Sequence, residues 1–121
     1  MPIFIAMNHF RVDPARGAEF EALWRTRESW LAEAPGFVRF ALLRGEEPGH
    51  YASHTTWASR ADFEAWTRSE AFRKAHAQAP LPKGLLQGHP RLVTWEAVLE
   101  EEPGASARRD TAGRGDTIGG P

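Results

Sequence analysis

Candidate chemistry in this sequence centres on the segment FEAWTRSEAFRKAHA, residues 63–77, which contains Trp66, Phe72 and His76. Phe72 and His76 are four residues apart, so a helix would place both side chains on one face. A neutral imidazole near the end of a short helix could coordinate haem iron, and the aromatic residues could contact a flat ligand. A single histidine is more often a surface residue or a hydrogen-bonded core residue, and Trp66 could equally pack in the core. The spacing leaves both interpretations open.

Two polar residues lie within apolar patterns. Asn8 interrupts the apolar segment IFIAMNHFRV, residues 3–12. An amide is uncommon in strands and costly to bury without hydrogen bonds, so a ligand could be its partner. Arg27 lies in a stripe of apolar residues at helical spacing. Its guanidinium either extends to water from a buried stem or awaits an anionic group at the mouth of a cavity.

The composition argues against several other kinds of site. The chain has no Cys, which removes disulfides, thiolate catalysis and cysteine metal centres. His50 and His54 lie on or beside one predicted strand, and at ~3.3 Å per residue their Cα atoms are roughly 13 Å apart, too far to bind one ion. The net charge of −1 gives no electrostatic reason to expect nucleic acid or an anionic membrane as a partner.

Length and composition predict one domain. The 121 residues are 41% hydrophobic, enough for one core. The N-terminal segment MPIFIAMNHF has no basic region, and its apolar run is too short for a signal peptide or a membrane span, so we expect a cytoplasmic protein. Five Trp and seven Phe exceed what a small core needs, which indicates an apolar cavity for a flat ligand or a dimer interface.

The elements that position these residues follow from local patterns. Residues 3–12 predict a strand, and a helix is expected next, with Asp13 as its N-cap and Pro14 at its first position. Its apolar stripe runs over residues 19–34 and ends at the following Pro-Gly pair. Residues 37–44 and 51–57 then predict two strands, joined in a hairpin by the turn GEEPGH.

A second helix is predicted from a capping box formed by Ser59 and Asp62. Ser69 is typical of a second N-cap, so this helix should break near residues 67–69 and restart. Residues 77–90 predict a long loop and residues 91–99 the last strand. Residues 100–121 are rich in charges, Gly and Pro, so we expect a disordered tail after one domain over residues 1–99.

The element order β, α, β, β, α, β is that of a ferredoxin-like fold of the α+β class. It predicts a four-stranded antiparallel sheet with two helices on one face. The other face would be uncovered in a monomer and would carry large residues such as Trp57 or Trp95. A second subunit covering this face is the economical solution, so we expect a homodimer.

Several of these motifs together resemble the haem-degrading monooxygenases of the antibiotic biosynthesis monooxygenase superfamily. They are MNHF in the first strand, PGF opening the second, the Trp that closes the third with S..DFEAW behind it, and S.AFRKAH in the second helix. The resemblance covers residues 3–99. PGF and the Trp at the end of the third strand are shared across the superfamily, whereas the combination of Asn8, Trp66 and His76 is the specific part.

The resemblance implies a dimer whose two sheets form a shared α/β barrel, with one haem in each subunit. It implies that His76 is the proximal iron ligand, that Asn8 hydrogen-bonds the ligand on the distal side, and that Trp66 ruffles the porphyrin. Haem would be both cofactor and substrate, and the ring would be opened with O2 and an external electron donor such as a reductase, releasing iron. Phe72 would contact the haem, and Arg27, His89 and the loop over residues 77–90 are weaker candidates for contacts with its propionates or rim.

Two other functions remain open on the sequence. The same fold carries cofactor-free monooxygenases that act on a quinol or a polyketide-like aromatic, and in such an enzyme Trp66 and His76 would contact an organic substrate. The chain could also bind or carry haem without turnover. The product of ring opening and the physiological reductant do not follow from the residues.

Overall fold

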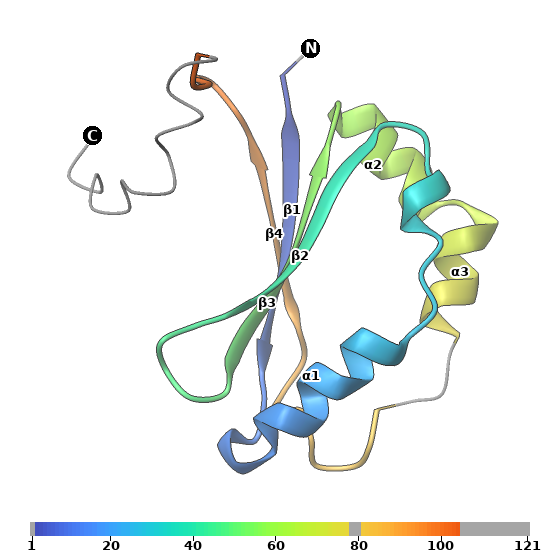
Figure 1. The fold of residues 1–121 in the computed structure, drawn as a ribbon. Helices are drawn as coiled ribbons and strands as arrows, with labels where there is room; N and C mark the ends of the chain where they lie inside the picture. The colour runs from blue at the N-terminus through green and yellow to red at the C-terminus, as the bar shows by residue number, and fades with distance from the viewer. Residues whose placement is uncertain (1, 78–80, 105–121) are drawn as a thin grey trace.

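The computed structural model describes residues 2–77 and 81–104. Four strands form one sheet in the order β2-β3-β1-β4, and every neighbouring pair is antiparallel. The helices lie on one side of this sheet (Figure 1). The architecture confirms the predicted ferredoxin-like fold. The elements are β1 (Phe4–Arg11), α1 (Gly17–Thr26), β2 (Phe37–Arg44), β3 (His50–Trp57), α2 (Arg60–Thr67), α3 (Glu70–His76) and β4 (Arg91–Glu96), with short 3-10 helices at Pro14–Arg16 and Leu31–Glu33.

Side-chain caps set the helix boundaries that the sequence predicts. The Asp13 carboxylate accepts a hydrogen bond from the amide of Ala15. The Ser59 hydroxyl accepts from the amide of Asp62 at 3.2 Å and therefore begins α2. The Ser69 hydroxyl likewise accepts from the amide of Phe72 at 3.1 Å and begins α3, which confirms the break in the second helix.

The prediction that the apolar stripe of the first helix continues over residues 19–34 is wrong. α1 ends at Thr26, and Arg27 has an extended backbone with φ −72° and ψ 153°. Tertiary packing explains why the helix ends here, because the buried Phe20 and Leu31 belong to two different apolar clusters. The chain leaves the helical path after Thr26, and Leu31 packs with Phe4 in the second cluster from a separate 3-10 turn.

The two faces of the sheet are assigned by the strand register. Phe4 pairs with Trp57, and both side chains contact Phe63 of α2, so they lie on the helix-covered face. The expectation that Trp57 lies on the uncovered face is therefore wrong, and Trp57 is completely buried. Trp95 pairs with Ile5 on the opposite face and is 55% exposed, as predicted.

The apolar core on the helix-covered face is divided into two clusters. The first cluster surrounds Phe20 of α1, and the second surrounds Trp57 beside α2. Residues with small or polar side chains, Ala6, Asn8, Ser53 and Thr55, occupy the strand positions between the clusters. No residue of α3 is buried. The half-buried Phe72 of α3 contacts Trp66, which packs against the second cluster.

The segments around the last strand differ in part from the prediction. β4 ends at Glu96 rather than residue 99, and Val98 and Leu99 are exposed. The predicted loop before it contributes one core residue, because Leu85 is fully buried in the first cluster. Of the predicted disordered tail, residues 105–121 lie outside the described part of the chain.

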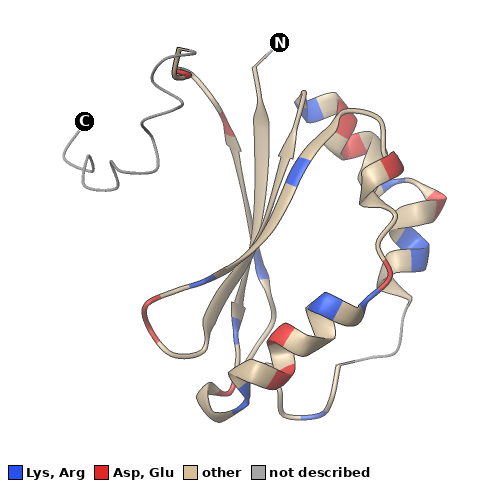
Figure 2. Cartoon of the chain, viewed as in Figure 1, with Lys and Arg blue, Asp and Glu red and all other residues tan. Residues whose placement is uncertain are grey.

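Acidic and basic residues are both found along each helix (Figure 2). Within residues 2–77 and 81–104, no helix is long and apolar enough to cross a membrane.

Candidate functional site

A row of four aromatic rings runs from the buried end of β3 to the end of α3. The ring centroids of Trp57 and Trp66 are 6.0 Å apart, and those of Trp66 and Phe72 are 5.8 Å apart in an edge-to-face arrangement. Phe72 and His76 then stack with centroids 3.9 Å apart. The structure therefore brings Trp66, Phe72 and His76 together, and the caps of α2 and α3 fix the angle between their two helices.

The imidazole of His76 also makes a hydrogen bond within its own helix. Its Nδ1 atom lies 2.9 Å from the carbonyl oxygen of Phe72. A carbonyl oxygen can only accept, so Nδ1 carries the hydrogen. In the neutral ring, Nε2 then has a free lone pair, which is the form that binds a metal ion. His76 is exposed, so Nε2 is accessible.

Asn8 lies on β1 on the helix-covered face, between Ala6 and Phe10, and is half-buried. Its side chain makes no hydrogen bond with any described residue. Asn8 does not contact the aromatic row; it belongs to the small and polar strip between the two core clusters. The structure thus places the predicted amide on the sheet and the predicted imidazole on a helix that covers the same side of that sheet.

Arg27 follows the end of α1 and covers two aromatic rings. Its guanidinium carbon lies 4.7 Å from the ring centre of Trp24 and 4.9 Å from that of Phe40. The Nε atom is buried without a hydrogen-bond partner among the residues that the structure describes, and no ion pair joins Arg27 to them. Burial lowers the pKa of this guanidinium from its ordinary value. A cation in this position is short of an acceptor, which an anionic ligand could supply.

Two surface hollows accompany these residues. One, of about 380 Å³, lies beside α2 and α3 and includes Trp30 and Trp66 in its lining. The other, of about 290 Å³, lies between α1 and β2 and is lined by Trp24 and Phe40 among others. Neither hollow is lined by Asn8 or His76, so the predicted site residues do not share one of these two cavities.

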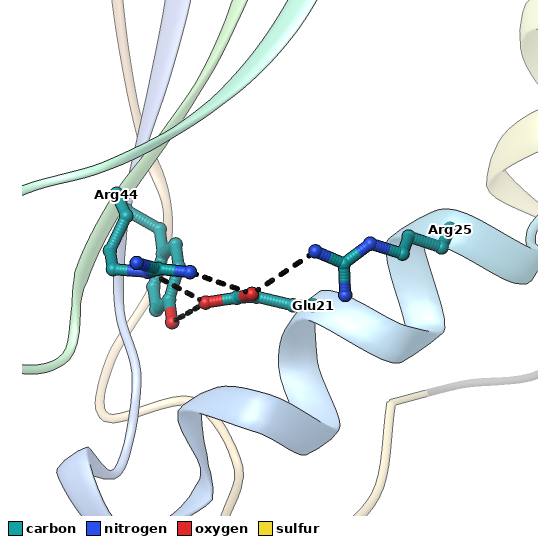
Figure 3. Close-up of polar contacts among 4 residues, drawn as sticks. Glu21, Arg25 and Arg44 are labelled. Carbon is teal, nitrogen blue, oxygen red and sulfur yellow. Dashed lines mark hydrogen bonds and ion pairs between the residues drawn. The ribbon is translucent and has the colours of Figure 1, made fainter.

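A polar cluster that the sequence does not predict borders the smaller hollow (Figure 3). Arg44 donates two hydrogen bonds to Glu21, from Nε at 2.8 Å and from Nη2 at 3.0 Å. The hydroxyl of Tyr51 donates to the same carboxylate at 2.6 Å, and Arg25 approaches it at 3.4 Å. Hydrogen bonds from Arg44 and then from Tyr51 lower the pKa of the Glu21 carboxylate to about 2. Only the i, i+4 spacing of Glu21 and Arg25 was visible in the sequence.

This cluster holds α1 against β2 and β3. Arg44 and Tyr51 come from these two neighbouring strands, and Glu21 lies one turn before Trp24 on α1. The cluster therefore fixes the part of α1 that leads into Trp24 and Arg27.

The remaining histidines do not extend the site. Nδ1 of His9 and Nε2 of His50 are 3.3 Å apart on the uncovered face of the sheet, a pairing that the sequence analysis did not anticipate. Among residues 2–77 and 81–104, no group of three or more His, Asp or Glu side chains could hold a metal ion.

Comparison with known proteins identifies the family. The family model described as antibiotic biosynthesis monooxygenase matches residues 3–78. The chain is 33% identical over 103 residues to deoxynogalonate monooxygenase of Streptomyces nogalater, covering 84% of this chain and 75% of that protein. It is 31% identical over 105 residues to the mycobilin-producing haem oxygenase of Mycobacterium tuberculosis. This match covers 83% of this chain and 92% of that protein. A solved structure of the M. tuberculosis haem degrader MhuD, with two haems in its active site, matches with a TM-score of 0.67 and 28% identity. This match covers 82% of this chain and 99% of the MhuD chain. The chain therefore belongs to the antibiotic biosynthesis monooxygenase family.

Proposed function

We propose that the protein is a haem-degrading monooxygenase, which binds haem, opens the porphyrin ring with O2 and an external electron donor, and releases iron. The observation that carries the proposal is the hydrogen bond from Nδ1 of His76 to the carbonyl oxygen of Phe72. In the neutral imidazole this bond leaves Nε2 with a free lone pair, as a residue that would hold haem iron requires.

The aromatic surface beside His76 would suit a flat, largely apolar ligand. Phe72 and Trp66 offer aromatic surface that continues from the imidazole. Arg27 would bind a propionate, since its buried Nε has no acceptor among the described residues. Asn8 would donate a hydrogen bond from the sheet on the distal side of the haem, because its amide has no partner in the described structure.

Bound haem would supply the oxygen chemistry, and the protein would supply position and surroundings. His76 would orient the ring from α3, and Trp66 would press on the porphyrin from the side of α2. The ring of Trp66 packs against the buried Trp57 at a centroid distance of 6.0 Å, and this packing restricts its movement when it contacts the porphyrin. The apolar rings would exclude water from the reacting face.

Two of the comparisons support this assignment. The curated M. tuberculosis relative is named as a haem oxygenase, and the MhuD structure contains two haems in its active site. Both comparisons extend over more than four-fifths of the present chain. The need for a reductase and a cytoplasmic location are part of the same proposal.

A hemin titration tests the proposal. The purified full-length protein should give a shifted Soret band that saturates at a fixed stoichiometry. Addition of a reductant under air should then bleach this band and release iron, which a chelator detects. A stable Soret band under these conditions would indicate a haem carrier, and a protein that does not bind hemin would contradict the proposal.

A cofactor-free monooxygenase acting on a quinol or polyketide-like aromatic is the second candidate. It is favoured by the hollow of about 380 Å³ lined by Trp30 and Trp66, which could hold such a ring without His76. The 33% identity to deoxynogalonate monooxygenase also supports it. Oxygen consumption with an aromatic quinol, in a protein that does not bind hemin, would establish this alternative.

We also propose a homodimer that forms through the uncovered face of the sheet. Trp95 and Leu43 are exposed large apolar residues on this face, and the half-buried Ile5 and Met7 lie between them in the register. A second copy would remove this apolar surface from water.

A further inference from the structure

A single row of side chains crosses all four strands at the middle of the helix-covered face. Asn8 pairs with Leu92 of β4 on one side and with Ser53 of β3 on the other, and Ser53 pairs with Leu42 of β2. Residues that pair across strands project to the same face. From β4 to β2, the row consists of Leu92, Asn8, Ser53 and Leu42. Its two polar residues are adjacent, and their Cβ atoms are roughly 4.5–5.5 Å apart.

The two polar members of this row lack partners. Ser53, like Asn8, is half-buried, and neither side chain forms a hydrogen bond with a described residue. Thr55 provides a contrast on the same strand and face, because its hydroxyl donates to the carbonyl oxygen of Ala6 at 3.3 Å. A half-buried hydroxyl without a partner costs free energy unless water or a ligand satisfies it.

The row also lies where the core is interrupted. It separates the cluster around Phe20 from the cluster around Trp57, and α3 buries no residue against it. Leu92 is on the helix-covered face yet 55% exposed. Asn8 and Ser53 thus form a half-buried polar pair between Leu92 and Leu42, in the interval between the two clusters.

We propose that Ser53 is a second hydrogen-bonding residue of the haem site, on the same side of the ligand as Asn8. This inference rests on the proposed function. The Ser53 hydroxyl and the amide of Asn8, on adjacent strands, would both donate to a small ligand of the haem iron. Two neighbouring donors orient such a ligand better than one, because a second hydrogen bond excludes ligand orientations that a single hydrogen bond allows.

The affinity of the ferric hemin complex for azide tests this role without turnover. Azide is a small anion that binds ferric haem, and donors beside it strengthen its binding. Ser53→Ala should weaken azide binding about ten- to hundredfold, the equivalent of one hydrogen bond to a charged group at tenfold per 1.4 kcal/mol. Asn8→Ala should lower azide affinity as well. Hemin affinity itself should change little in either variant.

Two control variants separate a hydrogen bond from a packing effect. Ser53→Thr keeps the hydroxyl and should keep the azide affinity of the unaltered protein. Thr55→Val removes a hydroxyl that already bonds to the backbone, so azide affinity should not change. Unchanged azide affinity in Ser53→Ala, or an equal loss in Thr55→Val, would overturn the role of Ser53 while leaving haem degradation intact. Failure of the unaltered protein to bind hemin would overturn both proposals.

Discussion

One residue fixes both the orientation and the tautomer of His76. The ring of Phe72 stacks on the imidazole at a centroid distance of 3.9 Å, and the carbonyl oxygen of Phe72 accepts a hydrogen bond from its Nδ1 atom at 2.9 Å. The spacing of four residues on α3 produces both contacts. His76 is thus an exposed residue whose ring is held by contacts with Phe72 of its own helix.

Replacement of His76 tests its role as the iron ligand. We expect His76→Gln to lose the shifted Soret band and to weaken hemin binding by at least about tenfold, since even changes beside a metal ligand cost that much. Hemin titration followed by absorbance measures both. His54→Gln, on the uncovered face, is the matched control and should bind hemin normally. A His76 variant with unaltered spectra and turnover would remove this residue from the site.

Replacement of Trp66 tests its action on the porphyrin. Trp66→Ala should still bind hemin but degrade it about tenfold more slowly or worse, because a distorting wall contributes about 1–5 kcal/mol. The rate of Soret loss under reductant and air measures this effect. Trp30→Phe alters another aromatic residue of the same hollow and should leave the rate nearly unchanged. Normal turnover in Trp66→Ala would argue against ring distortion by this side chain.

Replacement of Arg27 should separate ligand binding from stability. Arg27→Met keeps an unbranched stem on Trp24 and Phe40 but removes the buried Nε that lacks a partner. The cost of an unpaired polar group, about 1–3 kcal/mol, offsets the lost cation-π contacts. We therefore expect urea unfolding of the ligand-free variant to show no loss of stability, whereas hemin affinity should fall about tenfold or more. Lower stability with normal hemin affinity would mean that Arg27 serves packing alone.

A charge on the uncovered face should dissociate the proposed homodimer. Trp95 is 55% exposed on this face, and burial of a tryptophan at an interface contributes about 2 kcal/mol or more. Trp95→Asp should therefore sediment as a monomer at concentrations where the unaltered protein is a dimer. Leu81→Asp changes an exposed leucine of the loop before β4 and serves as the control. A monomeric unaltered protein would contradict the dimer.

The Glu21 cluster should make stability sensitive to acid. Hydrogen bonds from Arg44 and Tyr51 lower the pKa of Glu21 from 4.5 to about 2 in the folded protein. A lowered pKa means that this contribution to stability is complete above pH 4.5 and is lost as the pH falls towards 2. Thermal unfolding should show a smaller drop in midpoint between pH 6 and pH 3 for Glu21→Gln than for the unaltered protein. Glu64→Gln, an exposed residue of α2, should retain the original pH dependence.

Local signals in the sequence determined the elements and their order. Ser59 and Ser69 begin α2 and α3 through bonds to amides three residues ahead, so short-range patterns were enough to predict the break between these helices. The spacing of four residues between Phe72 and His76 likewise predicted that they share a helix face. The apolar pattern of residues 3–12 also marked Asn8 as a polar interruption of the first strand.

Contacts between distant segments were decided only by the tertiary structure. Nothing local assigns Trp57 to the buried face, pairs Ser53 with Asn8, or selects Arg44 and Tyr51 as partners of Glu21. A shift of one residue in strand register would exchange the two faces of a strand, and register is set by pairing across the sheet. The end of α1 is another such case, because Phe20 and Leu31 pack into separate clusters that one straight helix could not reach. Local propensity therefore specified which elements form, while packing between them chose which side chains meet.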